Sequence, residues 1–259
     1  MRWPSEGAFF VCLAVLYVAA GVWTTRRIAA TGDEPTYFMA ADALVRGEGL
    51  DLTARWQAVD TASYSPGEPI PREEFLRSTA PSRARPGAYP IHDIGLPLLI
   101  ALPFVLGGRG LVVALIGVGM AVAVALGVRA ALALGLSRGS ALAGGAAAGL
   151  TVPALTYSGQ VFPDAAAPIV VGVAACALVG AAPRWALGVA LAALPLLHVR
   201  FWPILFGLAV AALVLWRPHR RDAALIFAPA ALTVVGLCAL GLAVYGLPLP
   251  HAGFLLFFA

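Results

Sequence analysis

Two adjacent acids stand where the first long apolar stretch gives way to polar sequence. Asp33 and Glu34 lie within the segment Thr31-Gly32-Asp33-Glu34-Pro35-Thr36-Tyr37. Asp33 or Thr31 could simply cap a helix that has Pro35 in its first turn, but capping accounts for only one acid. A carboxylate beside a helix N-terminus at a water interface stays ionised, and within reach of a hydroxyl it can act as a general base. The pair therefore predicts acid–base chemistry.

Cations that could neutralise a phosphate lie elsewhere in the chain. Arg200 and His198 interrupt the apolar stretch 184–216, and an Arg in the middle of such a stretch is costly and usually functional. A guanidinium binds a phosphate through two parallel N–H groups. The alternative is a short outer turn that holds Arg200 in water and is capped by His198. Arg26 and Arg27 are second candidates, with snorkelling towards lipid headgroups as their alternative.

Four further residues complete the candidate set. Asp164 comes from a second polar turn, so Asp33 and Asp164 could flank one acceptor or hold a divalent cation through oxygen ligands. Tyr37 follows the acid pair and could contact the acceptor. His92 and Asp93 could contact the acceptor or a metal, with an ordinary loop pair as the alternative. The use of a metal stays open.

The composition restricts the class of protein. Of the 259 residues, 61% are hydrophobic and 12% are charged, and the mean hydropathy is +0.88, which excludes an ordinary soluble domain and a disordered chain. Nine of the 13 acids lie between residues 33 and 74. Cys12, Cys176 and Cys238 each lie in an apolar run, which predicts buried thiols without a disulfide framework. Nothing in the sequence suggests binding to nucleic acid.

The apolar runs predict a single membrane domain, residues 1–259. It consists of a first helix at 8–25, an outer loop at 28–92, a short segment at 94–107 and the remaining helices at 110–245. The segment 94–107 contains two prolines and is too short to cross, which favours a re-entrant or interfacial piece. The stretch 184–216 is too long for one crossing, so we expect two short helices that meet near His198–Arg200.

The expected fold is an all-α, polytopic transmembrane helix bundle of about seven crossings. Besides the first helix and the two halves of 184–216, the crossings are expected at 110–128, 140–157, 162–182 and 223–245. The Arg residues of the later loops all fall on the cytoplasmic side if the N-terminus is inside. The outer loop should contain amphipathic interfacial helices, such as one from Pro35 to Val45 with Phe38 and Ala41 on its apolar face.

The acid motif and this topology resemble the GT-C superfamily of glycosyltransferases. These membrane enzymes use polyprenyl-phosphate sugars and include protein O-mannosyltransferase and aminoarabinose-transferase relatives. A first helix followed by Gly-Asp-Glu-Pro-x-Tyr opens a large outer loop, and three later segments resemble the family in order: Tyr89-Pro90-Ile91-His92-Asp93-Ile94-Gly95-Leu96-Pro97, Tyr157-Ser158-Gly159-Gln160-Val161-Phe162-Pro163-Asp164 and His198-Val199-Arg200-Phe201. The chain would correspond to the family's N-terminal seven-helix module, so we expect a missing C-terminal part or a partner subunit.

The resemblance implies an activity and a location. A sugar would move from a polyprenyl-phosphate donor to an acceptor hydroxyl, on the outer side of a bacterial inner or plasma membrane. A transporter or flippase for a lipid-linked intermediate is the alternative from another class, but transporters place charge at the bilayer midplane and often show repeated halves. A non-catalytic membrane scaffold is a third reading.

The resemblance also implies roles for the candidate residues. Asp33, or Glu34 in its place, would be the general base, and Asp164 would be a second carboxylate near the acceptor or a metal. The donor phosphate would be held by Arg200 with His198, or by Arg26 and Arg27. Tyr37, His92 and Asp93 would lie near the acceptor or serve the loop.

Overall fold

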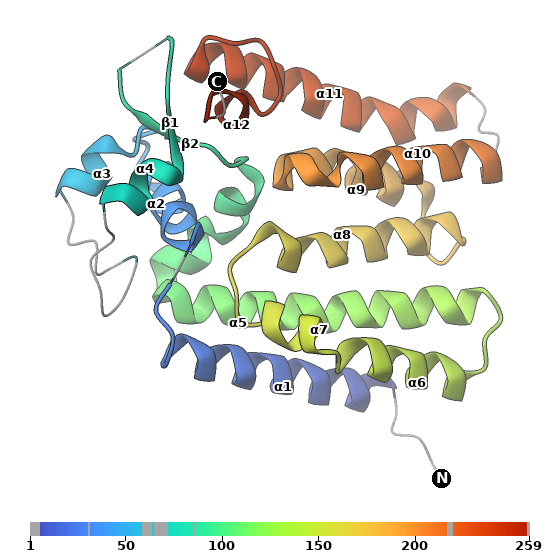
Figure 1. Cartoon of the computed structure of the whole chain (residues 1–259). Coiled ribbons are helices and arrows are strands. Elements are labelled where there is room, and N and C mark those ends of the chain that lie inside the picture. Colours follow the sequence, from blue (N-terminus) through green and yellow to red (C-terminus); the bar gives the residue numbers. More distant parts are fainter. Residues whose placement is uncertain are drawn as a thin grey trace.

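The computed structural model describes residues 6–30, 32–58, 64, 72–84, 86–216 and 220–257. Long helices lie side by side, and the described residues of 32–94 and 246–257 gather at one end of them, which we term the loop end (Figure 1). Within these described ranges, four helices are long and apolar enough to cross a membrane: Glu6–Thr25, Gly95–Ala133, Val199–Trp216 and Asp222–Tyr245. The prediction of a predominantly helical membrane protein is confirmed at this level.

The elements divide between the bundle and the loop end. The bundle contains α1 (Glu6–Thr25), α5 (Gly95–Ala133), α6 (Arg138–Gly149), α7 (Val152–Tyr157), α8 (Pro163–Leu178), α9 (Arg184–Leu197), the 3₁₀ turn η2 (Val199–Phe201), α10 (Trp202–Trp216) and α11 (Arg220–Tyr245). The loop end contains α2 (Glu34–Val45), α3 (Thr53–Ala58), α4 (Arg72–Arg77), β1 (Thr79–Pro81), β2 (Ala88–Pro90) and α12 (Ala252–Phe257). The two strands pair antiparallel, with Thr79 opposite Pro90, and this small sheet departs from the all-α expectation.

A kink divides α5 where the sequence predicts a boundary. Gly107 and Gly108 have non-helical backbone angles, and Gly108 adopts φ 61° and ψ −159°, a region open essentially to glycine alone. The part before the kink contains Pro97 and Pro103, and the part after it is the long apolar run. The kink therefore separates the segment 94–107 from the long apolar run; that this segment is re-entrant or interfacial stays a prediction.

Two other predicted crossings are divided into shorter helices. The stretch 140–157 is not one helix, because α6 ends at Gly149 and Thr151 caps a new helix, α7, by accepting from the Ala154 amide. This break is a correction to the prediction. The expected division of 184–216 is confirmed, since α9 ends at Leu197 and α10 begins at Trp202.

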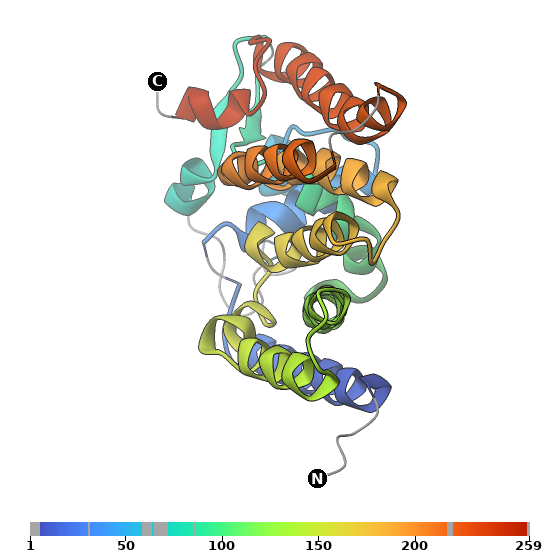
Figure 2. The ribbon, with the colours of Figure 1, turned by 90° about the vertical axis from the view of Figure 1, so that its right-hand side faces the viewer.

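Small residues bring the bundle helices together. α5 packs between α1 and α8, and α9 packs between α8 and α11, as the view along the helices in Figure 2 shows. A Cβ atom at Gly117 of α5 would lie 3.0 Å from the Val18 nitrogen, and one at Gly188 of α9 would lie 2.5 Å from the Leu225 carbonyl oxygen. Close backbone approach at small residues is the usual basis of helix packing in membranes.

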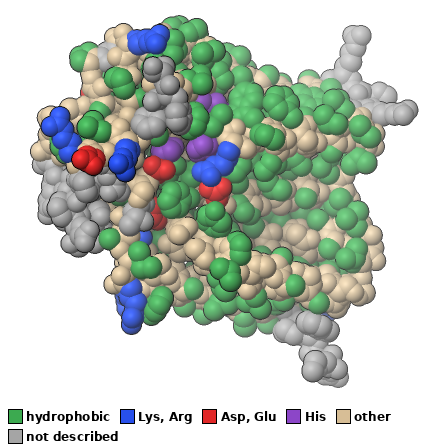
Figure 3. Space-filling model, in the orientation of Figure 1, with side chains coloured by type: hydrophobic (Ala, Val, Ile, Leu, Met, Phe, Trp, Pro, Cys, Tyr) green, Lys and Arg blue, Asp and Glu red, His purple; other side chains and the backbone are tan. Residues whose placement is uncertain are grey.

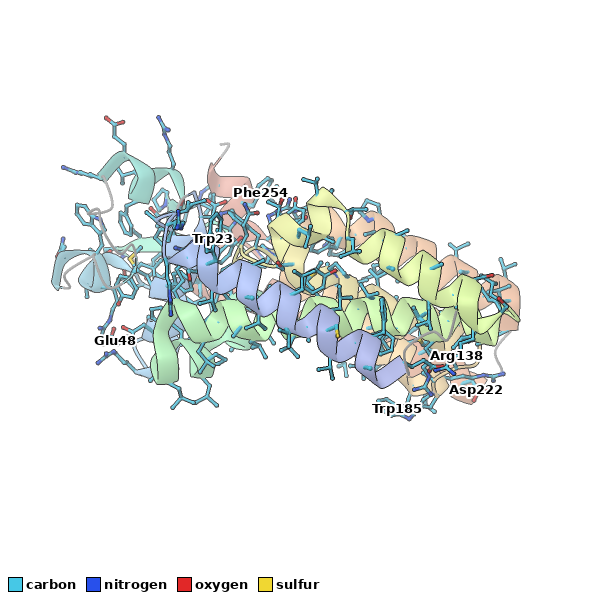
Figure 4. All side chains as sticks on the ribbon, turned by 90° about the horizontal axis from the view of Figure 1, so that it is seen from below. Trp23, Glu48, Arg138, Trp185, Asp222 and Phe254 are labelled. Atoms are coloured by element: carbon cyan, nitrogen blue, oxygen red, sulfur yellow. The ribbon has the colours of Figure 1, made fainter. Side chains whose placement is uncertain are left out.

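Charged and polar residues lie towards the two ends of the bundle. Arg138 pairs with Glu6, and Arg184 pairs with Asp222, at the end opposite the loop end. Figure 4 shows Arg138 and Asp222 at this end and Glu48 at the other. Large apolar side chains are exposed along the helices between them, which is the distribution of a bundle surrounded by lipid.

The prediction of an interfacial amphipathic helix in the first loop is wrong. The helix itself is present as α2, but every residue from Glu34 to Ala43 is buried. Phe38 stacks on Phe104 of α5 with ring centroids 4.8 Å apart, while Val45 at the helix end is exposed. Apolar residues lie all around α2 rather than on one face, and a helix of that kind belongs in a core.

The cysteines are free, as predicted, but they are not all buried. Cys176 is buried and Cys238 is half-buried, whereas Cys12 is exposed. An apolar run identifies a membrane helix without telling which face contacts protein and which contacts lipid, and Cys12 lies on the outer face of α1.

Candidate functional site

Ionisable side chains of both signs gather where the loop end meets the bundle. Figure 3 shows acidic, basic and histidine side chains close together at this border, beside a largely apolar surface. The contacts below identify the members as Asp33, His92, Asp164, His198 and Arg200, with Tyr37 beneath them. These residues come from α2, the segment after β2, the first turn of α8 and the junction between α9 and α10.

Asp33 occupies the N-cap position of α2 but does not cap the helix. Among the described residues, its side chain makes no capping hydrogen bond. Instead Ser78 Oγ donates to Asp33 Oδ1 at 3.1 Å. His92 Nε2 lies 3.0 Å from the same oxygen, although its N–H is not aimed along an ideal hydrogen bond. The carboxylate remains 36% exposed, so a substrate can reach it.

Asp33 is held in its ionised form. Burial raises the pKa of Asp33, but the contact with His92, the hydrogen bond from Ser78 and the charges of His92 and His198 outweigh burial and leave the pKa below its ordinary value. At neutral pH the group is therefore a carboxylate with free lone pairs.

Tyr37 lies in the centre of the cluster. Its side chain is buried, and its ring centroid is 5.2 Å from His92 and 6.4 Å from Phe162. Burial, and next the charge of Asp33, raise the pKa of Tyr37 well above its ordinary value, with Arg200 acting in the opposite direction. The phenol stays protonated and can donate a hydrogen bond into the site.

Arg200 and Asp164 form an ion pair across two helices. Arg200 Nη1 lies 3.1 Å from Asp164 Oδ2, and the Arg200 side chain is 48% exposed. Arg200 belongs to the short turn η2. The two alternatives from the sequence, a solvated turn and a phosphate-binding arginine, are therefore compatible with one another. A guanidinium has five N–H donors, which leaves donors for an anion beside Asp164.

His198 closes the turn that carries Arg200. Its Nδ1 accepts from the Arg200 amide at 3.2 Å, so the predicted capping role is present. Its ring centroid is 5.7 Å from that of His92. Burial, followed by the charge of Arg200, lowers the pKa of His198 to about 4, so the ring is neutral near pH 7. A neutral ring that accepts at Nδ1 carries its hydrogen on Nε2.

Glu34 faces away from Asp33 and serves the fold. Its side chain is 3% exposed, Arg109 Nη2 lies 2.9 Å from Oε2, and the Val161 amide donates to Oε1 at 2.6 Å. Arg109 also donates to the Ile28 carbonyl oxygen at 2.6 Å. Glu34 therefore joins α2 to α5 and to the segment before α8, and its burial keeps it from an acceptor hydroxyl.

Arg109 is a residue that the sequence reasoning missed. It follows the Gly107–Gly108 kink directly, and an isolated Arg beside two glycines in an apolar region was the available signal. Only its position relative to Glu34, 75 residues away in the chain, shows that it is part of a buried ion pair.

Arg26 and Arg27 lie apart from the cluster. Both are exposed beyond the end of α1, and the Arg27 guanidinium carbon is 4.8 Å from the centroid of the Trp23 ring; Figure 4 shows Trp23 on this helix. Among the described contacts, none joins either arginine to Asp33 or Asp164. Their position is that of interfacial anchors, which was the alternative from the sequence.

Asp93 lies behind His92 in a buried network of its own. His251 Nδ1 contacts Asp93 Oδ1, and Trp202 Nε1 donates to His251 Nε2 at 2.7 Å. Burial raises the pKa of Asp93, while His251 acts against this shift. Sequence reasoning missed His251 and Trp202, because neither lies in a recognisable motif.

The described residues contain no group of three or more His, Cys, Asp or Glu side chains that could hold a metal ion. Asp33 is engaged by Ser78 and His92, and Asp164 by Arg200. Asp33 and Asp164, which the sequence offered as metal ligands, therefore have other partners.

An apolar groove of about 250 Å³ opens beside the site between α5, α8 and α9. Gly95, Ala166 and Leu197 line it, and they lie one or two residues from Asp93, Asp164 and His198. The groove therefore adjoins, in the chain, the segments that carry Asp164 and His198, and its own lining is apolar.

No family model matches the chain, and searches of curated proteins and of solved structures find no match. The functional conclusion therefore depends on the site itself.

Proposed function

We propose that the protein is a membrane glycosyltransferase of the GT-C kind, which moves a sugar from a polyprenyl-phosphate donor to an acceptor hydroxyl. The observation that carries the proposal is the ionised, partly exposed carboxylate of Asp33 beside the Arg200–Asp164 pair. A base for a hydroxyl and a cation for a phosphate are the two groups that this reaction requires.

The reaction can be written on these residues. The acceptor hydroxyl gives its proton to Asp33, and its oxygen attacks the anomeric carbon of the sugar. The bond from this carbon to the phosphate oxygen breaks with inversion, and the polyprenyl phosphate leaves with the electron pair. Arg200 is half-exposed at the same border and balances the charge on the leaving phosphate, with neutral His198 beside it. The buried phenol of Tyr37 donates a hydrogen bond into the site.

The lipid part of the donor has a matching surface. The groove next to Asp164 and His198 is lined by Leu99, Ile169 and Val170 among other apolar residues, and a polyprenyl chain would fill it from the bilayer. A transporter would need charge halfway along the bundle, whereas this cluster lies where the bundle meets the loop end. This placement favours the enzyme.

The proposed topology has seven crossings with the N-terminus inside. The crossings are α1, the part of α5 after Gly108, α6 with α7, α8, α9, α10 and α11. The loop end and the site then lie on the outer side of a bacterial plasma membrane, and Arg138 and Arg184 lie on the cytoplasmic side, in agreement with the positive-inside rule.

The test is Asp33→Asn. Loss of a general base lowers the rate by roughly 10²–10⁴-fold, whereas Asn still accepts from Ser78 and is tolerated at an N-cap. Membranes with each variant would be incubated with a panel of polyprenyl-phosphate hexoses and pentoses, and the release of polyprenyl phosphate measured by mass spectrometry. Asp222→Asn at the opposite end is the matched control and should equal wild type.

Arg200 supplies a second arm of the same experiment. Arg200→Gln should weaken donor binding, and Arg200→Lys should be intermediate, because Lys keeps the charge without the two-pronged geometry. Wild-type turnover in Asp33→Asn, or unchanged donor binding in Arg200→Gln, would contradict the roles given to these residues.

A further inference from the structure

The C-terminal segment 246–257 packs against the segments that carry the site. In Figure 1, α12 lies at the loop end beside α11 and β1, and contacts with both elements are present. Just before this segment, Tyr245 donates from its hydroxyl to the Pro90 carbonyl oxygen at 2.5 Å. This bond joins two residues that are 155 positions apart in the chain.

His251 is the centre of this contact. Its Nε2 accepts from the indole N–H of Trp202, and an indole can only donate. The hydrogen of the neutral ring is therefore on Nδ1, which points at the Asp93 carboxylate. Both His251 and Asp93 are buried. His251 also adopts φ 59°, a backbone conformation that costs energy for a residue other than glycine, so its contacts hold it there.

The two partners of His251 adjoin the two halves of the site. Asp93 follows His92, which contacts Asp33. Trp202 follows η2, the turn that carries Arg200. One histidine therefore connects the side of the site that holds the base to the side that holds the cation. Phe254 adds to this contact, with its ring centroid 6.1 Å from His198, and Figure 4 shows Phe254 in this half of the molecule.

We propose that segment 246–257 is a latch that fixes the distance between the base and the cation, and that His251 is its positioning residue. The catalytic part of this statement rests on the proposed function; the structural part does not. His251 touches neither Asp33 nor Arg200 in any described contact, so it acts through Asp93 and Trp202. Without its side chain, Asp93 would keep a buried carboxylate without its ring partner, which is strongly unfavourable.

Two substitutions at position 251 separate the side chain from the backbone. His251→Gly removes the ring and relieves the positive φ, so it loses the latch without added strain. His251→Asn tolerates the same φ, and its amide nitrogen takes the place of Nδ1 and still donates to Asp93. Trp202→Phe removes the indole donor and keeps one aromatic ring. Its control is Trp216→Phe, which makes the same change at an indole that donates to the Leu178 carbonyl oxygen at the opposite end.

The first measurement does not depend on any activity. Diethyl pyrocarbonate reacts with accessible neutral imidazoles, and the modified peptides of His92 and His198 can be quantified separately by mass spectrometry. In purified His251→Gly both histidines should react several-fold faster than in wild type. His251→Asn should restore most of the protection, and Trp202→Phe should lie between them. Trp216→Phe should behave as wild type.

The second measurement is transfer. Misplacement of the base relative to the cation should lower kcat by roughly 10–100-fold in His251→Gly, with the KM for the acceptor little changed and partial recovery in His251→Asn. If His92 and His198 are modified faster in His251→Gly but the wild-type protein shows no transfer, the latch is supported and the proposed function is refuted.

Unchanged reactivity of both histidines in folded His251→Gly would overturn the latch, as would a loss of transfer that His251→Asn does not recover. If His251→Gly does not fold, Trp202→Phe decides. Equal reactivity in Trp202→Phe and Trp216→Phe then refutes the proposal, and faster reactivity in Trp202→Phe supports it.

Discussion

The buried pair of Glu34 and Arg109 predicts a large and specific loss of stability. Substitution of Arg109 by Met keeps most of the side-chain volume and removes the charge. Glu34, 3% exposed, would then keep the Val161 amide and lose the guanidinium at 2.9 Å. With charge centres about 4 Å apart and an effective dielectric of about 20, that attraction is about 4 kcal/mol. Breaking a buried pair typically costs about 3–5 kcal/mol, a large share of the about 5–15 kcal/mol that stabilises most domains.

The double variant makes the interpretation specific. Glu34→Gln alone leaves the Arg109 charge buried with the Ile28 carbonyl oxygen, so it should also be destabilising. In Glu34→Gln with Arg109→Met neither of the two positions carries a charge, and the Gln oxygen still accepts from Val161. The double variant should therefore be more stable than Arg109→Met alone. Losses that simply add would refute the pairing.

Unfolding of the purified protein in mixed detergent and SDS would give the free energies. Arg184→Met is the control, because it breaks the Arg184–Asp222 pair, whose partners are 54% and 36% exposed, and an exposed pair contributes about 0–1 kcal/mol. The same variants test the assignment of the base. A Glu34→Gln protein with wild-type stability and no transfer would show that Glu34, rather than Asp33, is the general base.

Three further expectations follow from local geometry. Gly108→Ala forces a side chain into φ 61° and should cost about 1–3 kcal/mol in the same unfolding assay, whereas Gly110→Ala, which has open space around it, should not destabilise. Folding lowers the pKa of His198 from 6.5 to about 4. As the pH falls, the unfolded chain therefore binds a proton before the folded chain does, and the free energy of unfolding should fall by roughly 3 kcal/mol between pH 6.5 and 4. His198→Asn, which keeps an acceptor for the turn, should flatten this dependence. In a cysteine-free background, a membrane-impermeant maleimide should label Ala84→Cys and not Ser137→Cys in intact cells, and the reverse pattern would invert the proposed topology.

Much of the architecture could be read from composition and from the placement of helix breakers. Hydropathy identifies membrane helices because lipid requires both apolar side chains and internally satisfied backbone groups. The boundary near Gly107–Gly108 was predicted from the short, proline-containing segment before it, and the interruption at His198–Arg200 from polar residues within an apolar stretch; both are present. These features are local, and local sequence is enough to predict them.

The site was predicted in part. Asp33, His92, Asp164, His198 and Arg200 were all selected, and the structure brings them together. Their selection depended on unusual polar residues at the borders of apolar runs, where a charge is costly unless it has a use. Asp33 and Glu34, however, could not be told apart, because adjacent residues have the same local context and differ only in the direction of their side chains.

The tertiary structure alone decided those directions and the distant partners. Glu34 turns inward because Arg109 of α5 lies beside it. α2 is buried because α5, α3 and β2 pack against it, and His251 contacts Asp93, 158 positions away in the chain. None of these contacts has a periodic or local signal. They depend on which helix faces come together in a close-packed bundle, and the energy of a buried charge is set by whatever the rest of the chain places beside it.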